Sequence, residues 1–177
     1  MKALRPQDIN PMIRMVNYSP TTVQQWGERT ISDFELILAL NGEFEFEDRH
    51  GVIRQRPRDV LVIYPEESHI FRVVAGFEKP FFSCVHCDMT AIPKNAVTLD
   101  CYRPDPWPRR LTSLGVNSEI PDLFRRAAEA FRKVSHFNME ITSSIVREIW
   151  LRLYDLWTSD ASPEMSARAK AMVEYLD

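Results

Sequence analysis

The chain has 177 residues, of which 45% are hydrophobic and 27% charged, and its formal net charge is −3. This length and composition exclude an intrinsically disordered chain and predict one domain with a sizeable core. No membrane segment is expected, because the longest apolar runs, such as residues 60–63, are far shorter than the roughly 18 residues that cross a bilayer. The near balance of 22 basic and 25 acidic residues gives no whole-chain electrostatic signature for binding nucleic acid.

The N-terminal residues, MKALRPQDINPM, lack the apolar core of a secretory signal peptide. The chain has three cysteines, an odd number that does not fit a framework of disulfides. We therefore expect a cytoplasmic protein with reduced thiols.

Short strands with hairpin-length connections are predicted over residues 34–88. The apolar run FELILAL at 34–40 ends at Asn41-Gly42, a dipeptide typical of tight hairpin turns. Residues 43–47 then alternate, with two phenylalanines facing a core and three glutamates facing water. Further strands are predicted at residues 52–56, 60–64, 69–74 and 81–88. Six or seven strands, recurring about every ten residues, indicate an antiparallel sandwich or barrel.

Helices are predicted after a proline-rich segment at residues 104–108, which cannot form a central strand. Residues 120–134 have the spacing of an ordinary amphipathic helix. Residues 138–158 carry two apolar stripes, one of isoleucine and leucine and one of aromatic residues. Because such a helix has to be covered twice, we expect the Ile/Leu stripe to lie on the barrel and the second face to form a homodimer. The residues expected in this interface are Trp150, Leu151, Tyr154 and Trp157.

A last helix is predicted from Ser162, which supplies an N-cap before Pro163, through Tyr175. The sequence stops at Asp177 without a glycine, asparagine or proline that would end this helix. We therefore expect the natural protein to continue beyond this residue.

Two histidines on predicted strands are the strongest candidates for a site. His69 shares its face with Phe71, and His86 shares its face with Phe82 and Cys84. These histidines and the cysteine lack the tight spacing of a metal motif, so we expect neither a metal nor another cofactor. The competing interpretation is that these residues simply line the inside of a small barrel.

Covalent catalysis has no support in the sequence, which contains 5 glycines and neither a nucleophile elbow nor a phosphate-binding loop. We therefore do not expect an enzyme. Arg29 lies just before the first strong strand, where its guanidinium could reach the mouth of a barrel and hold a hydroxyl or carboxylate group. The alternative is an ordinary surface arginine.

Residues 29–42, 56–65, His69 and 81–88 together resemble the effector-sensing N-terminal domain of AraC-type transcription regulators. That resemblance implies an α+β chain with a cupin-like antiparallel barrel followed by two to three helices. Residues 166–177 resemble the opening helix of the family's C-terminal helix-turn-helix domain. The domain limits that follow are 1–110 for the barrel with its N-terminal arm, 111–160 for the helical dimerisation segment, and 161–177 for a linker and a truncated DNA-binding domain.

The resemblance implies a bacterial regulator that binds a small polar effector, a sugar or a related molecule, in the barrel. The resemblance also implies that such a regulator contacts DNA only through a C-terminal domain, which is absent from this sequence. Arg29 matches an arginine that contacts sugar in the arabinose regulator, and Phe71 matches an aromatic residue of the pocket. Phe82 and Cys84 take the places of a histidine and a tryptophan, so arabinose itself is not expected as the ligand. With His69 and His86, these residues form the expected effector site.

Two other classes of function compete with this interpretation. Cupin barrels also serve as metal-dependent dioxygenases and isomerases, which resemble a pattern of two histidines one residue apart, a glutamate and a later histidine. Only His69 fits this pattern, as the later histidine. A purely structural dimerisation module is the third class. A polar cavity inside the barrel would argue against it, whereas a cavity filled by aromatic side chains would favour it.

Overall fold

The computed structural model describes residues 2–92 and 98–159 of the chain. Strands make up most of the first part, and helices make up most of the second part. The elements in chain order are β1 (Lys2–Leu4), a 3-10 turn (Pro6–Asp8), β2 (Met12–Pro20), β3 (Gln25–Arg29), β4 (Phe34–Asn41), β5 (Phe44–Asp48), β6 (Gly51–Gln55), β7 (Asp59–Ile63), β8 (His69–Val73), β9 (Phe81–Asp88), α1 (Thr98–Cys101), β10 (Tyr102–Pro104), β11 (Leu111–Ser113), α2 (Ile120–Arg132) and α3 (Asn138–Ser159).

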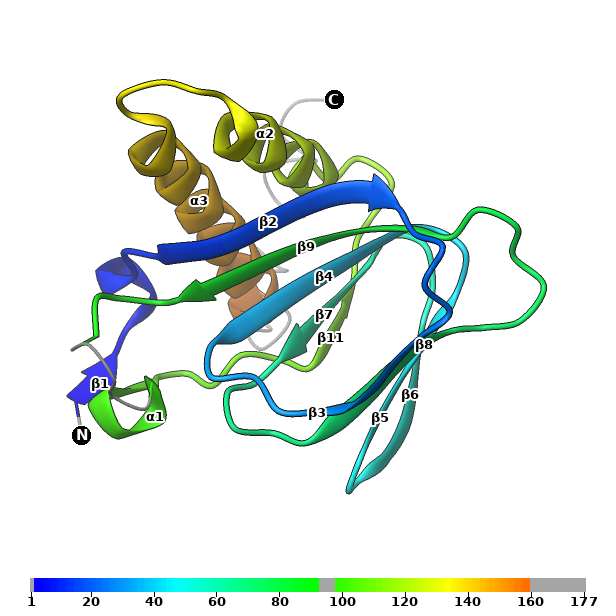
Figure 1. Cartoon of the computed structure of the whole chain (residues 1–177). Coiled ribbons are helices and arrows are strands. Elements are labelled where there is room, and N and C mark those ends of the chain that lie inside the picture. The colour runs from blue at the N-terminus through cyan, green and yellow to red at the C-terminus, as the bar shows by residue number, and fades with distance from the viewer. Residues whose placement is uncertain (1, 93–97, 160–177) are drawn as a thin grey trace, which may run out of the picture.

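Two antiparallel sheets face each other and form the barrel (Figure 1). The five-stranded sheet has the order β11-β7-β4-β9-β2, and the four-stranded sheet has the order β3-β8-β5-β6. Between β2 and β9 the chain crosses repeatedly from one sheet to the other, which wraps the two sheets around one interior. The predicted antiparallel barrel followed by helices is therefore confirmed.

The strands predicted between residues 34 and 88 are all present, with ends that differ by at most one residue. Strands β2 and β3 were not predicted individually. β2 is an edge strand that buries little more than Val16, and β3 has no buried residue. Neither strand therefore shows the apolar alternation by which the other strands are recognised.

Strand β4 is buried on both faces, which explains its almost continuous apolar sequence. Phe34, Leu36 and Leu38 point outward to the core shared with the helices. Ile37 and Ala39 point into the barrel, where they meet a second core that includes phenylalanines of β5, β8 and β9. The five-stranded sheet therefore separates a helix-side core from a barrel-side core.

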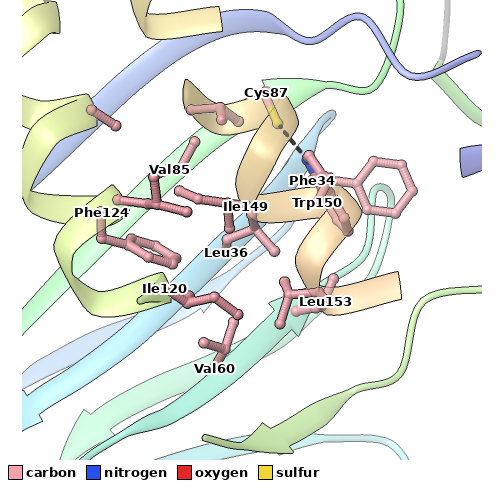
Figure 2. Packing of buried hydrophobic residues seen from close by; sticks show 14 of the residues in the cluster. Phe34, Leu36, Val60, Val85, Cys87, Ile120, Phe124, Ile149, Trp150 and Leu153 are labelled. Carbon is pink, nitrogen blue, oxygen red and sulfur yellow. Dashed lines mark hydrogen bonds between the residues drawn. The ribbon is translucent and has the colours of Figure 1, made fainter. Parts of the chain in front are cut away.

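Helices α2 and α3 form a hairpin that packs on the outer face of the five-stranded sheet (Figure 1). Trp150 is fully buried at this contact, where its Nε1 donates a hydrogen bond of 3.5 Å to Cys87 Sγ and its ring meets Phe34 edge to face. Figure 2 shows the labelled sheet residues Phe34, Leu36, Val60, Val85 and Cys87 against the helical residues Ile120, Phe124, Ile149, Trp150 and Leu153.

The aromatic stripe of α3 is covered from within the chain, so the expectation that this stripe needs a second copy of the protein is wrong. Trp150, Tyr154 and Trp157 are all buried. The Tyr154 hydroxyl donates to Pro106 O at 3.0 Å, and Trp157 Nε1 donates to Thr112 Oγ1 at 2.7 Å. The proline-rich segment and β11 therefore lie over the stripe that we assigned to a dimer interface. Leu151, the fourth residue assigned to that interface, is half-buried.

The predicted last helix, residues 162–175, lies outside the described residues, and the domain limits drawn from the sequence stay predictions. Within the described part of the chain, no helix is long and apolar enough to cross a membrane. Cys84, Cys87 and Cys101 are free thiols, as expected.

Candidate functional site

A cavity of about 260 Å³ opens into the barrel between the two sheets. The residues that line it come from β2, β3, β4, β8 and β9 and from the loop between β2 and β3. They are Met15, Asn17, Ser19, Pro20, Thr21, Val23, Trp26, Arg29, Glu35, Phe71, Phe82, Cys84 and His86.

Five of the six residues expected in the effector site line this cavity, and the sixth, His69, is hydrogen-bonded to one of them. The fold therefore brings together residues that are up to 57 positions apart in the sequence. Their role in binding a ligand stays a prediction.

Larger hollows of about 530, 450 and 350 Å³ lie elsewhere on the described surface. The largest, at the start of α2 and the end of α3, includes Arg152, whose guanidinium is paired with Glu119 at 2.7 Å. These hollows are more open, and the barrel cavity alone among them is lined by three aromatic side chains beside an ion-paired carboxylate and arginine. We therefore place the candidate site in the smaller cavity.

Arg29 occupies the rim of the cavity at the end of β3, where it pairs across the sheet with His69 of β8. A register shift between Trp26 and Arg29 marks an irregularity in this strand pair, of a kind that re-aims side chains. The Arg29 guanidinium donates from Nη2 to Glu35 Oε2 at 2.9 Å and from Nε to His69 Nε2 at 3.2 Å. A third of the side chain stays exposed, so Arg29 is both anchored and accessible.

Glu35 is the central carboxylate of the site, and the sequence analysis missed it. Its side chain is only 3% exposed on the barrel side of β4. Oε2 accepts the Arg29 bond, and Oε1 lies 3.1 Å from Nε2 of His86. The available signal was its position as the one charged residue within the apolar run 34–40, because an unpaired charge there would be very costly.

His86 lies between two buried carboxylates, with Nδ1 3.3 Å from Asp33 Oδ1 and Nε2 facing Glu35. Burial alone disfavours the imidazolium, but the hydrogen bonds to Asp33 and Glu35 outweigh it and raise the pKa of His86 to about 9. His86 is therefore charged at neutral pH. Behind it, Arg14 pairs with Asp88 at 2.8 Å and reaches Asp33 at 3.7 Å.

His69 is held in the opposite state. Burial lowers its pKa, and the nearby Arg29 cation adds to that effect. Its Nδ1 lies 2.9 Å from Glu67 O, a carbonyl that can only accept, so Nδ1 carries the proton and Nε2 accepts from Arg29. His69 is thus a neutral positioning residue for Arg29.

Aromatic rings form the apolar wall of the cavity. Trp26 meets Phe82 edge to face at 5.3 Å between ring centroids and lies 5.5 Å from Phe71. Phe44, behind them, stacks on Phe71 at 5.4 Å. This wall can accept a flat or apolar ligand surface at little cost, since the rings are already fixed by one another.

Cys84 and His86 lie next to each other on the inner face of β9 and share a donor cluster with Glu35. The ligand atoms of these three residues lie within 4.8 Å of one another. Sequence spacing did not reveal this cluster, because Glu35 belongs to a different strand. Burial raises the pKa of the Cys84 thiol, and Arg29 and protonated His86 both oppose a cation there. Without a metal, the cluster is therefore a network of protons and ion pairs.

No protein-family model matches the chain, and no curated protein sequence matches it either. ToxT from Vibrio cholerae has a similar structure over 82% of this chain and 56% of its own length, with a TM-score of 0.50 and 5% identity. A cupin domain from Bordetella pertussis is similar over 44% of this chain and 90% of its own, with a TM-score of 0.34 and 10% identity. A cupin-2 domain containing protein from Shewanella frigidimarina is similar over 42% and 76%, with a TM-score of 0.34 and 15% identity.

At these identities the likeness concerns the fold alone. The crossing of the chain between two antiparallel sheets and the likeness to ToxT over most of the chain support the same assignment. The chain is an α+β protein with a cupin-like antiparallel barrel followed by helices, as predicted.

Proposed function

We propose that the chain is the ligand-sensing and dimerisation part of a bacterial AraC-type transcription regulator and not an enzyme. Its barrel would bind a small polar effector, such as a sugar or a related molecule, and control DNA binding by a further C-terminal domain. The observation that carries this proposal is the barrel cavity, in which an accessible arginine lies beside an aromatic wall. A structural module with no ligand would have no need for buried charges around such a cavity.

The likeness of the fold to ToxT, an AraC-family protein, supports the regulatory part of the proposal. Strand β9, which contacts both the cavity and the helices, supports it as well. Cys84 and His86 of β9 line the cavity, while Val85 and Cys87 of the same strand belong to the helix-side core, and Cys87 contacts Trp150 of α3. A ligand would act by binding one arrangement of barrel and helices better than another.

A homodimer through the helical hairpin remains part of the proposal, although not through the buried aromatic stripe. The outer face of α3 leaves Ile141 at 50% and Leu156 at 39% exposure, and Leu151 is half-buried. These residues are the remaining apolar candidates on α3 for an isologous contact.

Ligand binding is tested by thermal denaturation of the purified chain with a panel of sugars, sugar acids and small aromatic acids. A ligand that binds the folded state raises the melting temperature by mass action. Arg29→Ala should abolish the shift, while Arg54→Ala, an exposed arginine paired with Glu43 outside the cavity, should retain it. No shift with any member of the panel, or a shift that survives in Arg29→Ala, contradicts the proposed site.

The second candidate function is a metal-dependent cupin enzyme, a dioxygenase or isomerase. The cluster of Glu35, Cys84 and His86 favours it, because these donors could hold a zinc or iron ion beside an open cavity. Metal analysis of protein purified without a His-tag separates the two functions. About one equivalent of iron, zinc or manganese per chain, lost in Cys84→Ser and His86→Gln, would replace the regulator proposal by the enzyme.

A further inference from the structure

The ionisable groups on the cavity wall are unequal in sign. Arg29 and His86 both line the cavity and both contact Glu35, the one carboxylate on the wall of described residues, so two basic side chains share a single acidic one. Asp33 lies behind His86, where Arg14 also reaches it. The carboxylates that balance the cluster therefore sit mostly on the side away from the cavity.

The cavity wall also has more free hydrogen-bond donors than free acceptors. Both oxygens of Glu35 are already engaged, by Arg29 and His86. Nη1 of Arg29 has no hydrogen-bond partner among the described residues. Asn17 Oδ1 accepts from Ser19 at 2.8 Å, and Thr21 Oγ1 accepts from the Val23 amide at 3.0 Å, so the amide and hydroxyl hydrogens of these two residues remain to be used. The free polar groups of the cavity are thus mainly donors, which require a ligand rich in acceptors.

The aromatic part of the cavity wall determines the size and polarity of the rest of the ligand. Trp26, Phe71 and Phe82 present ring surfaces with no hydrogen-bonding group other than the indole N–H. The cavity volume of about 260 Å³ lies just below the range for drug-sized ligands, which is about 300–1,000 Å³. A compact ligand with one small ring fills such a space.

We propose that the ligand is a small organic monocarboxylate with a flat apolar body, held by its carboxylate on Arg29 and by its ring against Trp26, Phe71 and Phe82. The inference rests on the proposed ligand-binding function and narrows its ligand class. It predicts that a charged acid binds better than a neutral sugar. A guanidinium offers parallel N–H groups to the two oxygens of a carboxylate, and Nη1 of Arg29 is not used by Glu35 or His69.

Benzoate and benzamide are matched probes, because they share one ring and differ in one charge. Calorimetric titration at pH 6.0, where benzoate carries its negative charge, should give benzoate at least tenfold tighter binding than benzamide. L-Arabinose and D-glucose serve as neutral polyol probes and should bind more weakly than benzoate. Cyclohexanecarboxylate and indole-3-carboxylate vary the body while keeping the carboxylate.

Two substitutions should move benzoate affinity in opposite directions. Arg29→Gln removes the cation that holds the carboxylate and should weaken binding at least tenfold. Glu35→Gln removes the competing carboxylate and releases Nη2 of Arg29, so it should strengthen binding several-fold. A simple loss of folding cannot strengthen binding, and Arg29→Lys, which keeps the charge, should bind benzoate with intermediate affinity.

The outcomes separate the ligand class from the proposed function. Equal binding of benzoate and benzamide, or binding of a neutral sugar with none of the three acids, overturns the monocarboxylate while ligand binding stands. Weakening in both Arg29→Gln and Glu35→Gln also overturns it, because the charge of the wall would then not govern affinity. Failure of the whole panel to bind overturns both this inference and the ligand-sensing function.

Discussion

His86 connects the cavity to the pH dependence of stability. Its pKa of about 9 in the folded chain lies above the ordinary value of 6.5, because Asp33 and Glu35 hold the imidazolium. A histidine with a raised pKa contributes stability that is fully present below pH 6.5 and is lost as the pH rises through 9. Asp33 and Glu35 therefore stabilise the folded chain most when the His86 imidazole is protonated.

We predict that the free energy of unfolding falls between pH 6.5 and pH 9, by up to about 3 kcal/mol from this residue. Urea denaturation at a series of pH values measures this effect. His86→Gln should flatten the slope, and His50→Gln, at an exposed turn position, is the matched control that should leave it unchanged. An equal slope in wild type and His86→Gln would mean that the ion pairs around His86 do not stabilise the fold.

Arg29 contributes to stability as well as to the cavity. Replacing Arg29 by Ala leaves the buried Glu35 carboxylate with His86 as its one remaining cationic partner. We expect a loss of about 1 to 3 kcal/mol, since an arginine one-third exposed is partly screened by water. Arg54→Ala, which breaks the more exposed pair with Glu43, should cost under about 1 kcal/mol in the same denaturation experiment. A reversed order would contradict the buried position of the Glu35 network.

At the scale of elements, α3 owes its position to large buried side chains from two stripes. Its N-terminal half rests mainly on Ile145, Val146 and Ile149, while its C-terminal half adds Trp150, Tyr154 and Trp157. The indole and phenol groups of this second set donate hydrogen bonds to β9, the proline-rich segment and β11. This helix is therefore fixed to the barrel on two sides.

We predict that Trp150→Ala costs about 3 to 5 kcal/mol of stability, because it empties a fully buried site between α3 and the five-stranded sheet. Ile141→Ala on the same helix is the control. Its side chain is 50% exposed, so the change should stay within about 0.5 kcal/mol. Chemical denaturation measures both, and a small effect of Trp150→Ala would show that α3 is held mainly by other contacts.

At the scale of the whole molecule, the two cores share one sheet, and this arrangement gives the cavity a physical connection to the outer helices. Inward side chains of β4 and β9 belong to the site, and outward side chains of the same strands carry α2 and α3. A rearrangement at the cavity can thus reach the surface proposed for dimerisation without a long chain of contacts.

We predict that the purified chain is a dimer through the exposed face of α3. Light scattering at tens of micromolar should give twice the chain mass, and the double variant Ile141→Glu, Leu156→Glu should give the mass of one chain, because it places carboxylates on the proposed contact. Val116→Glu, at an exposed position outside the helices, is the control that should remain dimeric. A monomeric wild type would contradict the proposal.

We also predict that residues 1–177 do not bind DNA selectively, because the formal net charge is −3 and no complete recognition helix is expected in this sequence. Electrophoretic mobility shifts with the operator region of the full-length gene test this. Tight binding that resists competitor DNA would place the DNA contacts within the chain described and refute the division of labour proposed above.

Several features of this protein followed from the sequence by itself. The alternation at residues 43–47 and the turns after Leu40 and Asp48 determine strands whose faces are assigned by a period of two. The same parity placed Phe71, Phe82, Cys84 and His86 on the inner faces of their strands, and the structure confirms that placement. The helices predicted at 120–134 and 138–158 followed from spacings of three and four residues, and the structure has them at 120–132 and 138–159.

Contacts between segments distant in the sequence were decided only by the tertiary structure, because local sequence patterns carry no information about them. Glu35 became the centre of the site because β4 pairs with β9 and lies near Arg29, three segments whose meeting depends on the closure of the barrel. The aromatic stripe of α3 was assigned to a contact with a second chain. The sequence shows that an apolar stripe has to be buried, but it does not show which segment buries it. In the folded chain, residues 104–112 lie over that stripe. Periodicity determines which side of an element is apolar, whereas the partner of that side is determined by packing between elements distant in the sequence.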